Sequence, residues 1–158
     1  MGNQVRSIEA RLGWLGGIID GEGTITATSN KRSKRQKNPF GQIQPKITMW
    51  NTDNNLIEEY MSILDEIGTT YYVFTQKPRA NNLGKKVCFR VEIHGLKRMV
   101  KVLPTIIPYL IAKKQKGIDL LLFCESRLAT PPNTPYSDME ISIVNRVREV
   151  PLLACAET

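Results

Sequence analysis

Hydrophobic and polar positions along the chain predict a helix, two strands and a second helix in its first half. Apolar residues recur at helical spacing over 7–20, and Ser7 has the side chain of an N-cap. Alternating positions predict strands over 24–30 and 42–50, which a polar hairpin tip would join. Helical spacing returns over 53–68, with an aspartate at its start and a glycine at its end. We therefore predict the order αββα for this half.

The second half of the chain repeats two strands and then adds helices. The predicted elements are strands at 71–77 and 86–93, joined by a turn that contains 81–84, and helices at 96–103, 113–128 and 137–150. Pro104 and Pro108 are expected to break the chain between the first two of these helices. The last helix begins with the Ser-x-x-Glu spacing of a capping box. We predict an α+β fold in one domain over 1–158, with a core at about 7–128 and a C-terminal helical extension at about 129–158.

The first helix ends in an apolar segment that is rich in glycine, WLGGIIDGEG. Four residues at helical positions i, i+3, i+4 and i+7 form a stripe almost without side chains: Gly13, Gly16, Gly17 and Asp20. Such a stripe lets another backbone approach closely. Gly21 and Gly23 are expected to end the helix and to leave the Glu22 carboxylate just beyond it, beside carbonyls at the negative pole. Clustered oxygen ligands of this kind suit a hard divalent cation such as Mg²⁺.

The charge of the chain favours a polyanionic partner. Its 22 Lys and Arg exceed its 15 Asp and Glu, and the formal net charge is +7. Two predicted strand regions, 24–50 and 68–91, hold 11 of these basic residues and none of the acidic ones. A surface that lies against phosphates requires such an absence of carboxylates. We therefore expect a nucleic acid as the partner.

The cysteine and histidine content makes a zinc site improbable. The three cysteines, Cys88, Cys124 and Cys155, are widely spaced, and His94 is the single histidine. Reduced, buried thiols are expected for Cys88 and Cys124, as in a reducing compartment. With neither a signal peptide nor a long apolar run, we expect an intracellular protein without a membrane partner, in the cytoplasm or an organelle matrix (chloroplast or mitochondrion), and not a secreted one.

The segment from Leu15 to Gly23 resembles the LAGLIDADG signature of homing endonucleases, position by position. It keeps the first leucine, both apolar positions, the first acid at Asp20 and the final glycine. The differences preserve size or charge, and they are Gly16, Ile18, Gly21 and Glu22. The resemblance implies the αββαββα LAGLIDADG fold, in which a four-stranded antiparallel saddle lies along DNA. A chain with one motif is implied to act as a homodimer, through the stripe of Gly13, Gly16, Gly17 and Asp20.

The activity that the resemblance implies is metal-dependent hydrolysis of both strands at a long, near-palindromic DNA site. Glu22 and the Gly21 carbonyl would bind Mg²⁺; Mn²⁺ is expected to substitute, and Ca²⁺ to support binding without cleavage. Lys113 would lie beside the scissile phosphate. Asp20 would cap and order the helix pair more than it would bind metal. Asn51 is the candidate that positions water, with Thr52 and Asp53 as alternatives for that place.

The candidate DNA contacts are the strand positions that face away from the core and the basic hairpin tip. Lys, Arg, Gln and Asn can read base edges in the major groove, and Thr can contact a thymine methyl group. The candidate readers are Thr24, Thr26, Thr28, Asn30, Gln42, Gln44, Lys46, Thr48, Trp50, Thr75, Lys77, Lys86 and Arg90. For the strand at 71–77, the sequence leaves open which face points inward. The candidate phosphate contacts are Lys31, Arg32, Lys34, Arg35 and Lys37.

Other functions on the same fold stay open. Some proteins with this fold are maturases that assist splicing of their host intron RNA, and others are regulators that bind DNA without cutting it. A regulator is disfavoured because a protein that only binds has no need of Glu22 at the helix end. A basic RNA-binding protein of ribosomal type would explain the charge but not the motif.

Overall fold

A computed structural model of the chain describes residues 6–30, 38–78, 86–150 and 152. Several residues named above lie outside these ranges, namely Lys31, Arg32, Lys34, Arg35, Lys37, Cys155 and the turn at 81–84. The candidates that carry the chemistry at the end of the first helix all lie within them.

The described elements follow the predicted order αββαββα, and two further α-helices come after it. They are α1 (Ile8–Glu22), β1 (Gly23–Asn30), β2 (Gln42–Asn51), α2 (Asn54–Glu66), β3 (Tyr72–Gln76), β4 (Cys88–His94), α3 (Leu96–Ile106), the 3₁₀ turn η1 (Ile107–Tyr109), α4 (Lys114–Leu128) and α5 (Asp138–Val147). Ser7 and Asp53 cap α1 and α2 through their side chains, as predicted. The capping box between Ser137 and Glu140 is also present, so the start of α5 was correctly predicted.

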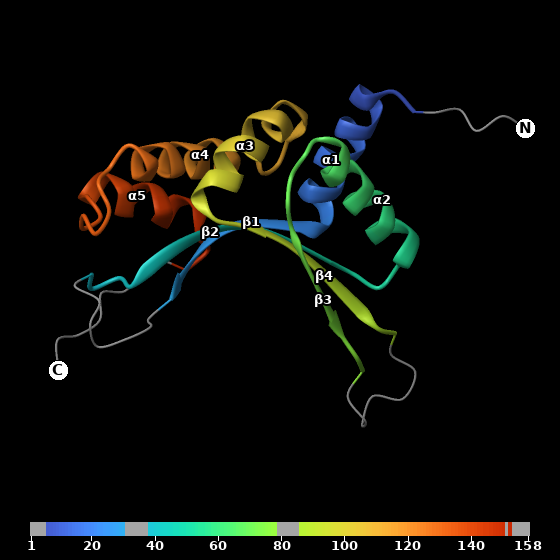
Figure 1. Ribbon diagram of the computed structural model, residues 1–158, viewed down its shortest axis with the longest axis horizontal. Coiled ribbons are helices and arrows are strands. Elements are labelled where there is room, and N and C mark those ends of the chain that lie inside the picture. Colours follow the sequence, from blue (N-terminus) through green and yellow to red (C-terminus); the bar gives the residue numbers. More distant parts are fainter. Residues whose placement is uncertain (1–5, 31–37, 79–85, 151, 153–158) are drawn as a thin grey trace, which may run out of the picture.

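The four strands form one antiparallel sheet in the order β1-β2-β4-β3. Figure 1 shows the helices on one side of this sheet, while the β1–β2 and β3–β4 hairpins extend in different directions beneath them. The sheet is therefore arched, with one face covered by helices and the other open.

Strand register decides which side chains face the helices. Met49 pairs with Val91 and Ile47 with Ile93, and all four side chains are almost fully buried in the core. Side chains alternate between the two faces of a strand. The neighbours of these core residues therefore lie on the open face.

The helix breaks predicted at Gly21 and Pro104 were wrong. Gly21 does not end α1, because the helix continues to Glu22 and Gly23 begins β1. Gly23 is needed for close approach, since a Cβ there would lie 2.9 Å from the Ile19 Cα. Pro104 does not break α3 either, because the buried Leu103 and Ile106 on either side hold the helix against the core to its end.

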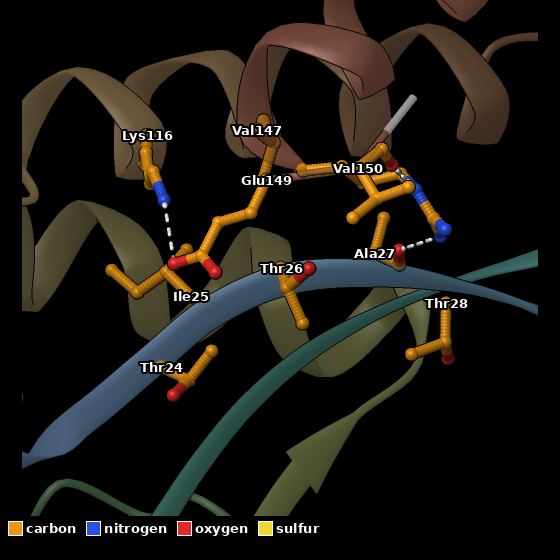
Figure 2. Close-up of a pocket in the computed structure, with 10 residues that line it drawn as sticks. Thr24, Ile25, Thr26, Ala27, Thr28, Lys116, Val147, Glu149 and Val150 are labelled. Atoms are coloured by element: carbon orange, nitrogen blue, oxygen red, sulfur yellow. Dashed lines mark hydrogen bonds and ion pairs between the residues drawn. The ribbon is translucent and has the colours of Figure 1, made fainter. Parts of the chain in front are cut away.

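The segment after α5 covers the outer edge of β1, which is an edge strand. Arg148 Nη1 donates a 2.6 Å hydrogen bond to the Ala27 carbonyl of β1. Figure 2 shows Glu149 reaching from the segment after α5 toward Lys116 of α4. Both residues line an open pocket of about 230 Å³. The C-terminal helix thus packs on α4 and β1.

Candidate metal and nucleic-acid site

The end of α1 brings together two residues that the sequence singled out. Glu22 is the last residue of α1, and its exposed carboxylate accepts a 3.1 Å hydrogen bond from Asn51 Nδ2 at the end of β2. Asn51 Oδ1 in turn accepts from the Asp53 backbone N–H at 2.8 Å, which fixes the orientation of the amide. Asp53 caps α2. Of the three alternatives, Asn51 is therefore the one whose side chain reaches Glu22.

Asp20 has a structural role within the chain. Its carboxylate accepts hydrogen bonds from the backbone N–H groups of Ile111 (2.6 Å), Ala112 (3.2 Å) and Lys113 (2.9 Å), at the turn that leads into α4. Burial alone would raise the pKa of Asp20, but these three donors and the nearby Lys113 charge outweigh it and lower the pKa. Asp20 therefore stays ionised and joins the end of α1 to the start of α4.

Lys113 lies at the same end of α1, as the N-cap residue of α4. Its Nζ donates hydrogen bonds to the carbonyls of Ile19 (2.9 Å) and Asp20 (2.5 Å). A cation is stabilised there because helix carbonyls concentrate negative charge at the C-terminus. The contact places the ammonium group within the turn that also carries Glu22.

The glycine stripe does not lie as predicted. A Cβ on Gly16 would lie 2.6 Å from the Tyr109 Cβ and 2.8 Å from its carbonyl carbon, so Gly16 packs inside the chain. Gly16 and Asp20 are thus used by the fold of the single chain and are not free for a partner. Gly13 and Gly17 have nothing within 4 Å of an added Cβ, and neither has Gly21. These three glycines, spaced by four residues, form the exposed glycine stripe of α1.

The oxygen atoms at the end of α1 suit Mg²⁺ in kind. The Glu22 carboxylate and the Gly21 carbonyl are hard donors, as Mg²⁺ prefers. Within the described residues, no group of three or more His, Cys, Asp or Glu side chains could hold a metal ion. Because three backbone N–H groups occupy the Asp20 carboxylate, Glu22 is the carboxylate that one chain offers at this helix end, and a complete octahedral shell would need oxygens from water, substrate or a second chain.

Most candidate readers lie on the open face of the sheet. Register places there Thr24, Thr26, Thr28, Asn30, Gln42, Gln44, Lys46, Thr48, Trp50 and Arg90. Lys77 and Lys86 are exposed and lie just outside β3 and β4. The candidate Thr75 does not lie on this face, because it pairs with Phe89 and lies on the helix side. Every residue of β3 is exposed, so neither face of the strand is buried. Its sequence therefore needs no alternation of hydrophobic and polar residues, and the two faces could not be told apart from sequence.

The open face also holds residues that the sequence reasoning missed. Glu92 lies beside Lys46 and Arg90, and Tyr72 and Phe74 of β3 expose about two fifths of their surface there. Glu92 could have been identified from sequence, because alternation along the strand puts it on the same face as Arg90, two residues earlier.

His94 belongs to a second cluster on this face. Its ring stacks on Tyr72, with centroids 4.6 Å apart and planes within 8°, and its Nδ1 lies 3.0 Å from Gln44 Nε2. Burial lowers the pKa of His94, and the charges of Arg98 and Lys46 add to this effect against the opposing Glu92 carboxylate. At neutral pH the ring is therefore uncharged.

Two further expectations concern thiols and membranes. Cys124 is fully buried, and burial together with the Glu125 charge raises its pKa to about 12, whereas Cys88 is only partly buried. The expectation of a buried thiol thus holds fully for Cys124 alone. Among the residues that the structure describes, no helix is long and apolar enough to span a membrane.

Comparison with known proteins identifies the family. Residues 9–106 match the family described as LAGLIDADG-like domain, so the chain belongs to the LAGLIDADG family. No curated protein matches the chain.

Solved structures with a similar fold include several homing endonucleases at low sequence identity. I-CvuI in complex with its target has a TM-score of 0.64 and 16% identity, over 89% of this chain and 81% of that chain. The archaeal intron-encoded I-Vdi141I complexed with DNA has a TM-score of 0.60 and 11% identity, over 89% and 98%. Group I intron-encoded I-CeuI complexed with DNA has a TM-score of 0.62 and 19% identity, over 95% and 70%. The predicted LAGLIDADG fold is thus confirmed.

Proposed function

We propose that this protein is a site-specific DNA endonuclease that binds a near-palindromic duplex as a homodimer and cuts both strands with divalent metal. The observation that carries the proposal is the juxtaposition of Glu22, Asn51 and Lys113 at the end of the motif helix. Similar folds have been solved on DNA. I-CvuI has been solved on its target with Ca, and on another target with Mg in a complex whose DNA was not cleaved.

The exposed glycine stripe supports a homodimer through α1. Gly13, Gly17 and Gly21 leave an open helix face on which a second α1 can pack closely. A two-fold axis beside Gly21 would bring the Glu22 carboxylates of both chains together. This pairing supplies the second carboxylate that a single chain lacks. Two symmetric sites also match the two strands that must be cut.

Glu22 and the Gly21 carbonyl are the groups that would hold Mg²⁺, or Mn²⁺ in its place. Such an ion activates water and stabilises the leaving oxygen of a phosphodiester. Asn51 holds the Glu22 carboxylate in one orientation and presents an amide beside it for an ordered water. Lys113 places a positive charge at the same turn, where it would stabilise charge that develops on the phosphate.

The open face of the sheet has the length of a half-site. β2 contains 10 residues, which at ~3.3 Å per residue extend over about 33 Å, or about ten base pairs. Two chains would therefore contact about 20 base pairs. Gln44, Lys46 and Thr48 face this groove with side chains able to contact base edges.

The substitution Glu22→Gln tests the catalytic assignment. It removes one charge at almost unchanged shape, so cleavage in Mg²⁺ should disappear while specific binding in Ca²⁺ persists. Glu125→Gln is the matched control, because Glu125 is an exposed residue of α4 on the other side of the sheet. Loss of binding as well as cleavage in Glu22→Gln would make Glu22 structural. Specific binding without cleavage by the unaltered protein would instead indicate a regulator or a maturase.

A further inference from the structure

The open face carries one carboxylate among the described strand residues, and this carboxylate lies near the centre. Glu92 pairs across the sheet with Thr48 on one side and Tyr72 on the other, and it is only 7% exposed. Its Oε1 lies 3.1 Å from Lys46 Nζ, and its Oε2 lies 3.5 Å from Arg90 Nε. A carboxylate repels DNA phosphates, so its presence in a basic face requires a reason.

The reason lies in how Arg90 is held. Arg90 pairs in register with Trp50 of β2 and with Phe74 of β3. Its guanidinium lies 5.0 Å from the centroid of the Trp50 ring and 4.3 Å from that of the Phe74 ring. The Arg90 Nε is buried and makes no hydrogen bond, so its contact with Glu92 is the 3.5 Å ion pair alone, while about a third of the side chain (32%) stays exposed. Two rings and one carboxylate thus fix a side chain that is otherwise flexible.

We propose that Arg90 reads a guanine in each half-site and that Glu92 is the positioning residue that makes this readout selective. The inference rests on the proposed DNA-binding function. A guanidinium fork can donate to O6 and N7 of guanine together, but only when its plane is aligned with the base edge. The ion pairs with Glu92 keep both Arg90 and Lys46 turned to the groove floor and away from phosphates. Because these cations occupy both Glu92 oxygens, Glu92 is not itself the reader of a base.

Preorganisation is the physical source of the selectivity. A free arginine on a DNA-binding face can contact any phosphate within reach and carries no sequence information there. Here Glu92, Trp50 and Phe74 hold Arg90 in the reading geometry, and we call these three residues the Arg90 clamp. An arginine held in this way loses little conformational entropy when it binds the correct base. Removing the clamp should therefore broaden specificity more than it weakens total affinity.

The test is a binding selection from randomised duplex DNA in Ca²⁺, which needs no cleavage. The unaltered protein should select guanine at one position of each half-site, by about 5- to 150-fold over other bases. Glu92→Gln should relax the preference for guanine at this position, and at any position that Lys46 contacts, while affinity for random duplex is equal or higher. Phe74→Ala should relax it too, and because Phe74 is exposed on an edge strand, this variant keeps the test independent of any folding defect in Glu92→Gln. Glu125→Gln, with the same change of charge outside the face, should leave the profile unchanged.

Two results would overturn the proposal. An unchanged profile in both Glu92→Gln and Phe74→Ala would show that the clamp does not set specificity. A switch from cytosine to adenine in Glu92→Gln would show that Glu92 reads a base directly. If the unaltered protein enriches no sequence at all, the proposed function itself fails, and this result is distinguishable from the other two.

Discussion

Gly16 and Gly17 are neighbours in the motif helix, yet the structure predicts opposite consequences when each is changed to alanine. Gly16 packs on Tyr109 of the same chain, whereas Gly17 faces open space. Under the proposed function, that open space is where the second α1 lies. The pair therefore separates packing within one chain from packing between two chains.

The magnitudes follow from the space around each Cβ. An alanine at 16 would place its methyl group 2.6 Å from the Tyr109 Cβ, far inside the ~3.5–4.0 Å of an ordinary carbon contact. Overpacking of this kind costs about 1–3 kcal/mol, and the better helix propensity of alanine returns about 0.5–1 kcal/mol. The net loss in the free energy of unfolding can thus reach about 2.5 kcal/mol, and Gly16→Ala should lie in the upper part of this range because the clash includes backbone atoms of Tyr109, which cannot rotate away. In an isolated chain, Gly17→Ala should raise it by about 0.5–1 kcal/mol.

Gly17→Ala should weaken association of the two chains, although it should stabilise the isolated chain. Each of the two helices gains a methyl group at the proposed contact, so the dimer dissociation constant should rise at least about tenfold. Urea denaturation of dilute protein measures the stability of the chain, and sedimentation equilibrium measures association. If Gly17→Ala is stabilised and associates as before, α1 does not pack on a second copy at this face. If Gly16→Ala loses no stability, the packing on Tyr109 is not as described.

Three further predictions concern single groups. Asp20→Asn should lose about 1–2 kcal/mol of stability at pH 7, because a charged acceptor of three N–H groups becomes neutral. Because the pKa of Asp20 is lowered by folding, its full contribution to stability is present above the pKa of the unfolded chain, about 3.9, and is lost as pH falls through the pKa of the folded chain. The urea midpoints of the unaltered protein and of Asp20→Asn should therefore converge in acid. Because the pKa of His94 is lowered in the folded chain, the unfolded chain takes up the His94 proton first as the pH falls. The free energy of unfolding should therefore decrease as pH drops below about 6.5. His94→Gln should remove this decrease, and a decrease of the same size in His94→Gln would contradict the prediction. Cys124 should react with a thiol reagent only after unfolding, and Cys88 sooner; fast labelling of native Cys124 would contradict its burial.

Local patterns were sufficient for the order of elements and for the residues at the helix end. The caps at Ser7, Asp53 and Ser137 are signals within a few residues, and all three hold in the structure. Alternation in β2 likewise gave the correct faces, because one side of that strand is buried throughout most of its length. Glu22 was identified from the motif, and the structure adds its hydrogen bond to Asn51.

Long-range contacts explain what the sequence could not show. Helical periodicity places Gly16 and Asp20 on a stripe, but their partners at 109–113 are about ninety residues away in sequence. No local pattern reveals that a distant turn returns to that helix. For the edge strand β3 the reason differs, since both of its faces are exposed and the assignment of Thr75 lacked a buried side to fix it.

Under the proposed function, one chain supplies half of a symmetric, metal-dependent DNA-cutting site. The most direct measurement is cleavage of a plasmid library with randomised near-palindromic sites in Mg²⁺, with Ca²⁺ in parallel. The account predicts double-strand cuts in Mg²⁺ alone, at sites with recoverable two-fold symmetry about 20 base pairs long. Bound but uncut DNA under both ions, or cuts at sites without two-fold symmetry, would contradict it.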